Sequence, residues 1–179
     1  MGARVITVSN RVALPEEAHS SVVDEMAVTV RAALKNQNGM WFGWSGKVTD
    51  QPASEPRILE VNKLTYVQIE LSSNDIQEYC NGLANSVLWP ILHYRVDLQE
   101  YSRADASGYM RVNHLFAGHL SALMNEDDIV WVHDYHLMLL SANCARAAIA
   151  TGSAFFCTRP ARRLTFCRPC RTTGRSSAD

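Results

Sequence analysis

The chain contains 179 residues, of which 47% are hydrophobic and 20% are charged, and its formal net charge is −1. These values are typical of an ordinary soluble domain and exclude a disordered chain. No apolar run approaches the roughly 20 residues that a membrane-spanning helix needs, and the first residues lack the basic segment and apolar stretch of a secretory signal. We therefore expect a cytoplasmic protein with no membrane partner.

The near-zero net charge hides two stretches of opposite character. Residues 1–140 contain 10 Lys and Arg against 17 Asp and Glu, a balance of −7, whereas residues 141–179 contain 7 Arg against 1 Asp, a balance of +6. The second stretch also holds four of the five cysteines, of which only Cys167 and Cys170 form a Cys-x-x-Cys pair. One such pair is a weak zinc signal, and disulfides are rare without export. We predict a folded domain over residues 1–140 and a disordered, Arg- and Cys-rich tail over residues 141–179.

Hydrophobic periodicity predicts alternating strands and helices in the first domain. Arg4–Val8 is a β-branched run typical of a buried strand, and Ser9-Asn10-Arg11 follows as a polar turn at its carboxyl end. Met26–Leu34 places apolar residues at helical spacing. The aromatic segment Met40–Gly46 fits a strand and a tight turn, and Leu64–Leu71 fits a further strand.

Two helices and a strand continue this alternation. Ser72-x-x-Asp75 resembles a capping box and predicts the start of a helix, which a break at Pro90 ends. Asp105–Met124 is the most strongly periodic helix, and Ile129–Val132 is apolar on both faces, as a central parallel strand requires. The polar segment His133–His136 follows. This order is typical of a doubly wound, Rossmann-like α/β sheet, whose ligands bind outside the carboxyl ends of the strands.

Two polar groups at the predicted strand ends are candidate binding residues. Arg11 could bind a phosphate, because a guanidinium offers paired donors and stays charged, or it could form a surface ion pair. Asp134, inside His133-x-x-His136, could accept hydrogen bonds from sugar hydroxyls or belong to a purely structural cluster. A metal is less favoured, because a strand end lacks the i, i+4 register of two helical histidine ligands.

Tryptophans in glycine- or proline-interrupted segments form a second group of candidates. They are Trp41, Trp44 and Trp89. A single Trp is more often a core residue than a ligand platform. Three of them in such interrupted segments also fit flat surfaces against the C–H faces of a pyranose.

Five ordered segments resemble the trehalose-phosphate synthases, retaining glycosyltransferases that join the glucose of UDP-glucose to glucose 6-phosphate. The segments are VSNRVALP at Val8–Pro15, GMWFGWSG at Gly39–Gly46, NGLANSVLWPILHYR at Asn81–Arg95, GYMRVN at Gly108–Asn113 and DDIVWVHDYHLMLL at Asp127–Leu140. The resemblance covers essentially all of residues 1–140 and none of the tail. It implies the N-terminal half of a two-domain GT-B glycosyltransferase, with the active site in the cleft between the domains.

The resemblance also implies roles for four residues. Arg11 would hold the acceptor phosphate or the donor pyrophosphate, Trp41 and Trp89 would line the acceptor glucose pocket, and Asp134 would bind the glucose hydroxyls. Glucose 6-phosphate and UDP-glucose are the partners that this implies, with no nucleic acid, metal or cofactor. The implied chemistry stabilises an oxocarbenium-like transition state electrostatically.

Three features depart from the family pattern. Asp24-Glu25 stands where the family has a Gly-Gly pair beside phosphate, and Cys80 stands where it has an acceptor-site tyrosine. The segment Gly152–Pro160 can be read as the family's Gly-Phe-Phe-Leu-His-Thr-Pro in the neighbouring reading frame, which suggests a frameshifted tail. We therefore expect this chain to be a truncated, inactive form. The alternative is a non-catalytic module that binds a sugar phosphate or regulates another protein.

Overall fold

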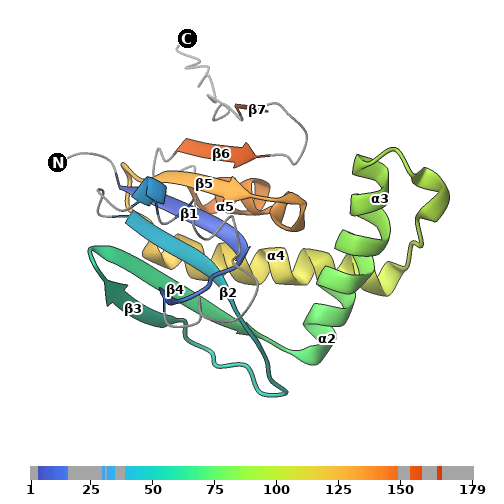
Figure 1. Cartoon of the computed structure of the whole chain (residues 1–179), viewed down its shortest axis with the longest axis horizontal. Coiled ribbons are helices and arrows are strands. Elements are labelled where there is room, and N and C mark those ends of the chain that lie inside the picture. The colour runs from blue at the N-terminus through green and yellow to red at the C-terminus, as the bar shows by residue number, and fades with distance from the viewer. Residues whose placement is uncertain are drawn as a thin grey trace, which may run out of the picture.

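A seven-stranded sheet with the order β3-β4-β2-β1-β5-β6-β7 forms the centre of the molecule (Figure 1). The computed structural model describes residues 4–15, 30, 32–34, 39–148, 154–158 and 165–166. The strands are β1 (Val5–Arg11), β2 (Gly39–Val48), β3 (Arg57–Val61), β4 (Leu64–Leu71), β5 (Ile129–His133), β6 (Ala154–Thr158) and β7 (Thr165–Phe166). Strands β4, β2, β1, β5 and β6 are parallel, and β3 and β7 pair antiparallel at the edges. The predicted Rossmann-like α/β class is confirmed.

The structure corrects the strand predictions in two places. Ser9, Asn10 and Arg11 belong to β1 instead of forming a turn, and the pairing of β1 with β2 shifts register between Ser9 and Arg11. Strand β3 was not predicted, and it forms a hairpin with β4 through Asn62 and Lys63, which have φ angles of 52° and 68°. Positive φ at both central residues is the requirement of a type I′ turn, whose twist matches that of the paired strands.

Helical segments connect these strands along the chain. They are α2 (Ser73–Asp75), η2 (Ile76–Leu88), α3 (Trp89–Leu92), η3 (Val96–Leu98), α4 (Arg103–Leu123), η4 (Tyr135–Leu137) and α5 (Leu140–Ala148). The predicted capping box is present, because Ser72 Oγ accepts from the Asp75 backbone N–H and the Asp75 carboxylate accepts from the Ser72 N–H. None of the helices in the described part of the chain is long and apolar enough to cross a membrane.

Segment η2 is a π-helix and not the α-helix that the capping box suggested. Its carbonyls accept hydrogen bonds from N–H groups five residues further on, as the Trp89 N–H does to the Ala84 carbonyl. The predicted break near Pro90 coincides with the end of η2 at Leu88, but the chain passes directly into α3 at Trp89 with Pro90 in the first turn. A proline is tolerated there because the N–H it lacks has no partner within a helix's first turn.

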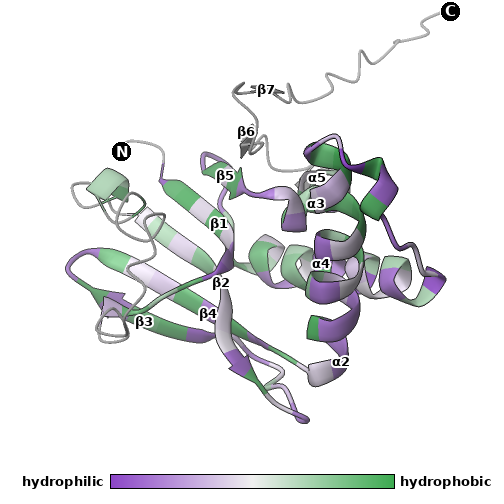
Figure 2. Ribbon diagram, turned by 45° about the vertical axis from the view of Figure 1, so that its right-hand side comes forward, coloured by the Kyte–Doolittle hydropathy of each residue, from purple (hydrophilic) through white to green (hydrophobic). Residues whose placement is uncertain are grey.

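Two apolar clusters lie on opposite faces of the sheet. The larger one packs against η2 and α4, and Tyr109, Val112, Phe116 and Leu120 of α4 are all buried there, as the predicted periodicity requires. The smaller cluster includes Trp41 and Tyr66 on the other face, together with Val30 and Leu34 from the predicted helix over residues 26–34. Figure 2 shows hydrophobic residues along the central strands and polar ones on the outer turns of the helices.

The chain contributes regular structure beyond residue 140. Helix α5 packs against α4, and β6 pairs with β5 in the register Ile129↔Ala154 to His133↔Thr158. The structure therefore departs from the expected disorder at residues 141–148 and 154–158. The division of the chain at residue 140 stays a prediction, and most of the predicted tail lies outside the described residues, as does Asp24-Glu25.

Candidate functional site

The ends of β1 and β5 bring the main candidate residues to one edge of the sheet. The two strands are adjacent and parallel, with Val8 opposite Val132, so Arg11 and Asp134 follow from neighbouring strands at the same carboxyl edge. Segment η2 is tied to that edge, because the Tyr79 hydroxyl donates a hydrogen bond of 3.0 Å to Asn10 Oδ1. Carboxyl edges of parallel strands are the usual ligand-binding location in open α/β sheets.

Asp134 has an unusual backbone conformation at this edge. Its φ and ψ angles are 77° and 158°, a region that is essentially restricted to glycine and that costs on the order of 1–3 kcal/mol for other residues. Two contacts hold it there: Oδ1 accepts a 2.7 Å hydrogen bond from the Tyr135 N–H, and Oδ2 lies 2.9 Å from His136 Nδ1. Backbone strain of this kind concentrates at functional sites, and here it fixes the direction of a carboxylate.

The Asp134 carboxylate keeps acceptor capacity for a ligand. Its side chain is 34% exposed, whereas that of His136 is 8% exposed. An ionised carboxylate has about two acceptor positions on each oxygen, and each Asp134 oxygen accepts one hydrogen bond within this network. The remaining positions suit the donating hydroxyls of a sugar.

The electrostatics favour a charged pair of Asp134 and His136. Burial alone would raise the pKa of Asp134, but the hydrogen bond and charge of His136 outweigh it and lower that pKa below its ordinary value. Burial alone would lower the pKa of His136, but the hydrogen bonds to Asp134 and Cys80 raise it to about 9. The pair is therefore carboxylate and imidazolium at neutral pH. His133 differs, because burial lowers its pKa more than nearby Asp134 raises it.

The network continues from His136 into η2. His136 Nε2 lies 3.7 Å from Cys80 Sγ, and Asn85 Nδ2 lies 3.9 Å from the same sulfur. The Tyr135 hydroxyl donates a hydrogen bond of 3.0 Å to Asn85 Oδ1. Segments η2 and η4 are therefore joined by two contacts, His136 to Cys80 and Tyr135 to Asn85. Cys80 and Asn85 are five residues apart, which is the spacing of hydrogen-bonded residues in a π-helix, so the two side chains lie on the same side of η2.

A buried asparagine fixes the segment that carries His136. Asn113 of α4 donates from Nδ2 to the His136 carbonyl at 3.1 Å and to the Tyr109 carbonyl at 3.0 Å. The Tyr109 hydroxyl in turn donates to the Tyr135 carbonyl at 2.6 Å. Asn85, Tyr109 and Asn113 were not predicted as site residues. All three lie in the segments Asn81–Arg95 and Gly108–Asn113 that carry the family resemblance, but nothing else in the sequence distinguishes them from their neighbours.

Arg11 is exposed, and its guanidinium lies across Gly46 at the end of β2. A Cβ at Gly46 would come within 2.5 Å of Arg11 Nε, and Gly46 has φ = 85°, so both space and conformation require glycine there. None of the ion pairs formed among the described residues includes Arg11. The guanidinium is thus positioned beside Gly46 at this edge of the sheet.

The tryptophans have different environments. Trp41 is 0% exposed within the smaller cluster, and its indole N–H donates to Ser9 Oγ at 2.8 Å. Its ring has no face open to a ligand in this structure, so the predicted pocket role of Trp41 is corrected to a core role. Trp89 is 44% exposed and stacks on His93 with ring centroids 3.9 Å apart. Trp44 pairs with Arg11 in the β1–β2 register and is half-buried.

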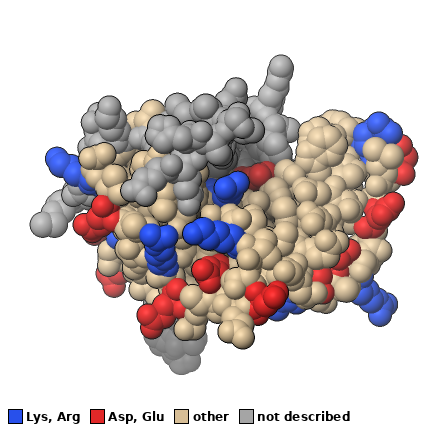
Figure 3. Space-filling model, turned by 60° about the horizontal axis from the view of Figure 1, so that its bottom comes forward, with Lys and Arg blue, Asp and Glu red and all other residues tan. Residues whose placement is uncertain are grey.

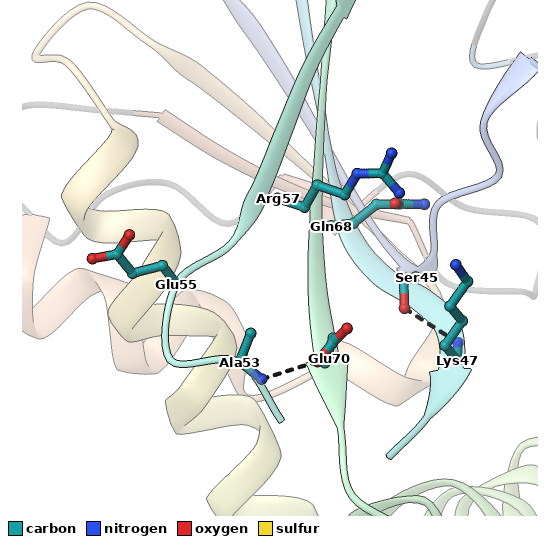
Figure 4. A pocket seen from close by; sticks show the side chains of 7 residues that line it. All are labelled: Ser45, Lys47, Ala53, Glu55, Arg57, Gln68 and Glu70. Atoms are coloured by element: carbon teal, nitrogen blue, oxygen red, sulfur yellow. Dashed lines mark hydrogen bonds between the residues drawn. The ribbon is translucent and has the colours of Figure 1, made fainter. Parts of the chain in front are cut away.

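A small cavity lies beside this edge between β2, β3 and β4 (Figure 4). Its volume is about 60 Å³, and its lining residues are Ser45, Lys47, Ala53, Glu55, Arg57, Gln68 and Glu70. Ligand pockets usually exceed about 300 Å³, so this cavity has room for water but not for a sugar. Its charges are mixed, and Figure 3 likewise shows Lys and Arg side chains beside Asp and Glu on one face of the molecule.

No group of three or more His, Cys, Asp or Glu side chains within the described ranges is placed to hold a metal ion. The His133–His136 segment explains this, because His136 directs its two ring nitrogens at different partners, Asp134 and Cys80. Asp134 and Cys80 thus lie on opposite sides of the imidazole and do not converge on one point. A single carboxylate that accepts hydrogen bonds from hydroxyl groups needs no such convergence.

Comparison with known proteins gives a consistent set of matches. Residues 3–158 match the model of glycosyltransferase family 20. The trehalose-6-phosphate synthase of Sinorhizobium fredii is 42% identical over 157 residues, which is 86% of this chain and 34% of that protein. The trehalose-6-phosphate synthase of Escherichia coli K12 is 40% identical over 156 residues. The chain thus spans about a third of the length of the curated relatives it matches.

Solved structures agree with the sequence matches. An α,α-trehalose-phosphate synthase (UDP-forming) from Burkholderia vietnamiensis superposes with a TM-score of 0.79 at 37% identity, over 87% of this chain and 32% of that one. The enzyme from Burkholderia xenovorans in complex with glucose-6-phosphate gives a TM-score of 0.75 at 42% identity, over 86% and 33% of the two chains. The E. coli enzyme bound with UDP-2-fluoro glucose superposes with a TM-score of 0.75 at 37% identity, over 86% of this chain and 32% of that one.

Proposed function

The chain belongs to glycosyltransferase family 20, and on this premise we propose that it forms the acceptor side of a trehalose-6-phosphate synthase. The complete enzyme would transfer glucose from UDP-glucose to glucose 6-phosphate with retention. The relatives named above are trehalose-6-phosphate synthases, and solved examples contain glucose-6-phosphate or a UDP-glucose analogue. Both substrates are charged metabolites, and we propose that the protein acts on them in the cytoplasm.

The observation that carries this proposal is the juxtaposition of Arg11 and Asp134 at one sheet edge. Arg11 would bind the phosphate of glucose 6-phosphate with the paired donors of its guanidinium. Asp134 would accept hydrogen bonds from the glucose hydroxyls through the acceptor positions that Tyr135 and His136 leave open. Trp89, exposed at the end of η2, would supply an aromatic surface to the same pocket.

Isothermal titration calorimetry with glucose 6-phosphate tests this assignment. Arg11→Ala should weaken binding by about ten- to a hundred-fold, the value of a hydrogen-bonded charge pair. Arg95→Ala is the matched control, because Arg95 is an exposed arginine that pairs with Asp97 away from the edge, and it should leave affinity unchanged.

Glucose itself provides the second arm of this test. Because glucose lacks the phosphate, Arg11→Ala should not change the affinity for glucose. Asp134→Asn should weaken the binding of both glucose and glucose 6-phosphate. If Arg11→Ala reduced the two affinities equally, Arg11 would act on the fold and not on the phosphate. If neither ligand bound the unmodified chain, the proposed acceptor site would be wrong.

Catalysis needs more than acceptor binding. Holding donor and acceptor in the reactive geometry supplies a large part of an enzyme's rate enhancement, and the residues of this edge would form one side of such a cleft. We therefore expect the 179-residue chain, purified alone, to bind glucose 6-phosphate without releasing UDP from UDP-glucose. A coupled assay for UDP checks this, and release that depends on glucose 6-phosphate would contradict it.

A further inference from the structure

Cys80 stands at the end of a chain of three side chains from two elements. The Asp134 carboxylate lies 2.9 Å from His136 Nδ1, and His136 Nε2 lies 3.7 Å from Cys80 Sγ. His136 is nearly buried, and its ring is further fixed by stacking on Tyr135 with centroids 4.3 Å apart. This order of carboxylate, imidazole and sulfur is the one in which a base activates a nucleophile while a third group orients the base.

Two hydrogen-bond donors face the Cys80 sulfur. The charged imidazolium of His136 donates toward the sulfur from Nε2, and Asn85 donates toward it from Nδ2 at 3.9 Å. A neighbouring imidazolium is the usual cause of a reactive cysteine. Cys80 is also only partly buried, so a small reagent can reach it. The glucose 6-phosphate proposal uses Asp134 but assigns no role to this sulfur.

We propose that Cys80, aligned with His136 and Asp134, is a nucleophilic site that small electrophiles modify covalently, with hydroperoxides as the biological class. The Cys80 sulfur attacks one oxygen of the peroxide and the O–O bond breaks. Sulfur is oxidised to a sulfenic acid, and the peroxide is reduced by two electrons. The departing oxygen takes the proton that the thiol gives up and leaves as water from hydrogen peroxide or as an alcohol from an organic hydroperoxide.

Cys144 provides an internal control for this proposal. It is 1% exposed on α5, and burial raises the pKa of its thiol to about 11. A thiol in that environment is protonated at neutral pH and out of reach of reagents, so it should react only when the chain unfolds. Protection of Cys144 therefore reports that the fold is intact in every variant.

The test measures iodoacetamide labelling of each cysteine at pH 7 by peptide mass spectrometry, in the native chain and in urea. An imidazolium held beside a cysteine sulfur accelerates its reaction with electrophiles. Partial burial of Cys80 reduces this gain, so native Cys80 should react several-fold faster than Cys80 in urea. A native rate equal to or below the rate in urea overturns the proposal.

Asp134→Asn tests whether the contacts from Asp134 through His136 to Cys80, called here the relay, make Cys80 reactive, or whether exposure of Cys80 alone is sufficient. This change keeps the shape of the side chain but removes the charge that holds the imidazolium, so Cys80 labelling should fall to about the rate in urea while Cys144 stays protected. Unchanged Cys80 labelling in this variant overturns the relay. Hydrogen peroxide followed by dimedone should tag Cys80 in the unmodified chain, and an untagged Cys80 overturns the assignment of hydroperoxides. None of these readouts depends on glucose 6-phosphate binding.

Discussion

Raising the pH from 6 to 10 should destabilise the fold through His136. The ordinary pKa of a histidine is 6.5, and in the folded chain the contacts of His136 with Asp134 and Cys80 raise its pKa to about 9. One pKa unit corresponds to 1.36 kcal/mol, so this difference is worth on the order of 3 kcal/mol of folding free energy. The His136 side chain is 8% exposed, so solvent screens little of this interaction.

The direction of the effect follows from the protonation of the two states. Below about pH 6.5 His136 is protonated whether the chain is folded or not, and the stabilisation is fully present. As the pH rises through about 9, the folded state also loses this proton and the stabilisation is lost. Asp134 stays ionised across this window because its pKa is lowered, and Tyr135 stays neutral because burial and the nearby charges of Asp134 and Cys80 raise its pKa to about 12.

Thermal unfolding between pH 6 and pH 10 measures the effect. For a chain of this size, a loss of 3 kcal/mol should lower the Tm by roughly 6–12 °C. Asp134→Asn should remove most of this pH dependence, whereas Asp97→Asn, an exposed carboxylate paired with Arg95, should retain it. Titration of the His136 ring by NMR gives the pKa directly. A midpoint near 6.5, or an unchanged slope in Asp134→Asn, would refute the reasoning.

Two further predictions concern glycines. Gly46→Ala would place a methyl group against the guanidinium of Arg11. Calorimetry should then show that the affinity for glucose 6-phosphate falls to about the level of Arg11→Ala. An unchanged affinity would show that binding does not depend on the position of Arg11. Gly108→Ala would press a methyl group into the Glu78 side chain and should lower the free energy of unfolding in urea by about 1–3 kcal/mol. Gly118→Ala, on the same helix with open space around it, should instead raise it by about 0.5–1 kcal/mol, and effects of the same sign would contradict the packing described.

Periodicity was sufficient to predict the central strands and α4, because burial on one or both faces imposes a pattern on consecutive residues. Strand β3 carries no such signal, since most of its residues are exposed. Its turn also lacks the glycine that usually marks a type I′ hairpin, because Asn62 and Lys63 adopt positive φ instead. The sequence therefore identified the strands at the centre of the sheet and missed β3 at one edge, as well as β6 and β7 within the predicted tail.

Side-chain placement was harder to predict than the strands themselves. Trp41 and Trp44 lie three residues apart in β2, so alternation places them on opposite faces of the sheet. Choosing the face that meets a ligand requires knowing what covers each one, and Trp41 proved to be enclosed by the smaller cluster. For Asp134, motif resemblance located the residue, but nothing in the sequence indicated its left-handed backbone or its relay to Cys80.

Two irregular backbone features of the described chain meet at one place. Asp134 adopts a conformation that other residues avoid, and η2 is a π-helix where an α-helix would satisfy the same capping box. Each is less stable than its regular alternative, and π-helical turns and strained residues both concentrate at functional sites. The network of Tyr135, His136 and Asn85 joins them, so its hydrogen bonds offset both at once. Relaxing either feature would turn the Asp134 carboxylate or Cys80 away from the sheet edge at which β1 also ends with Arg11.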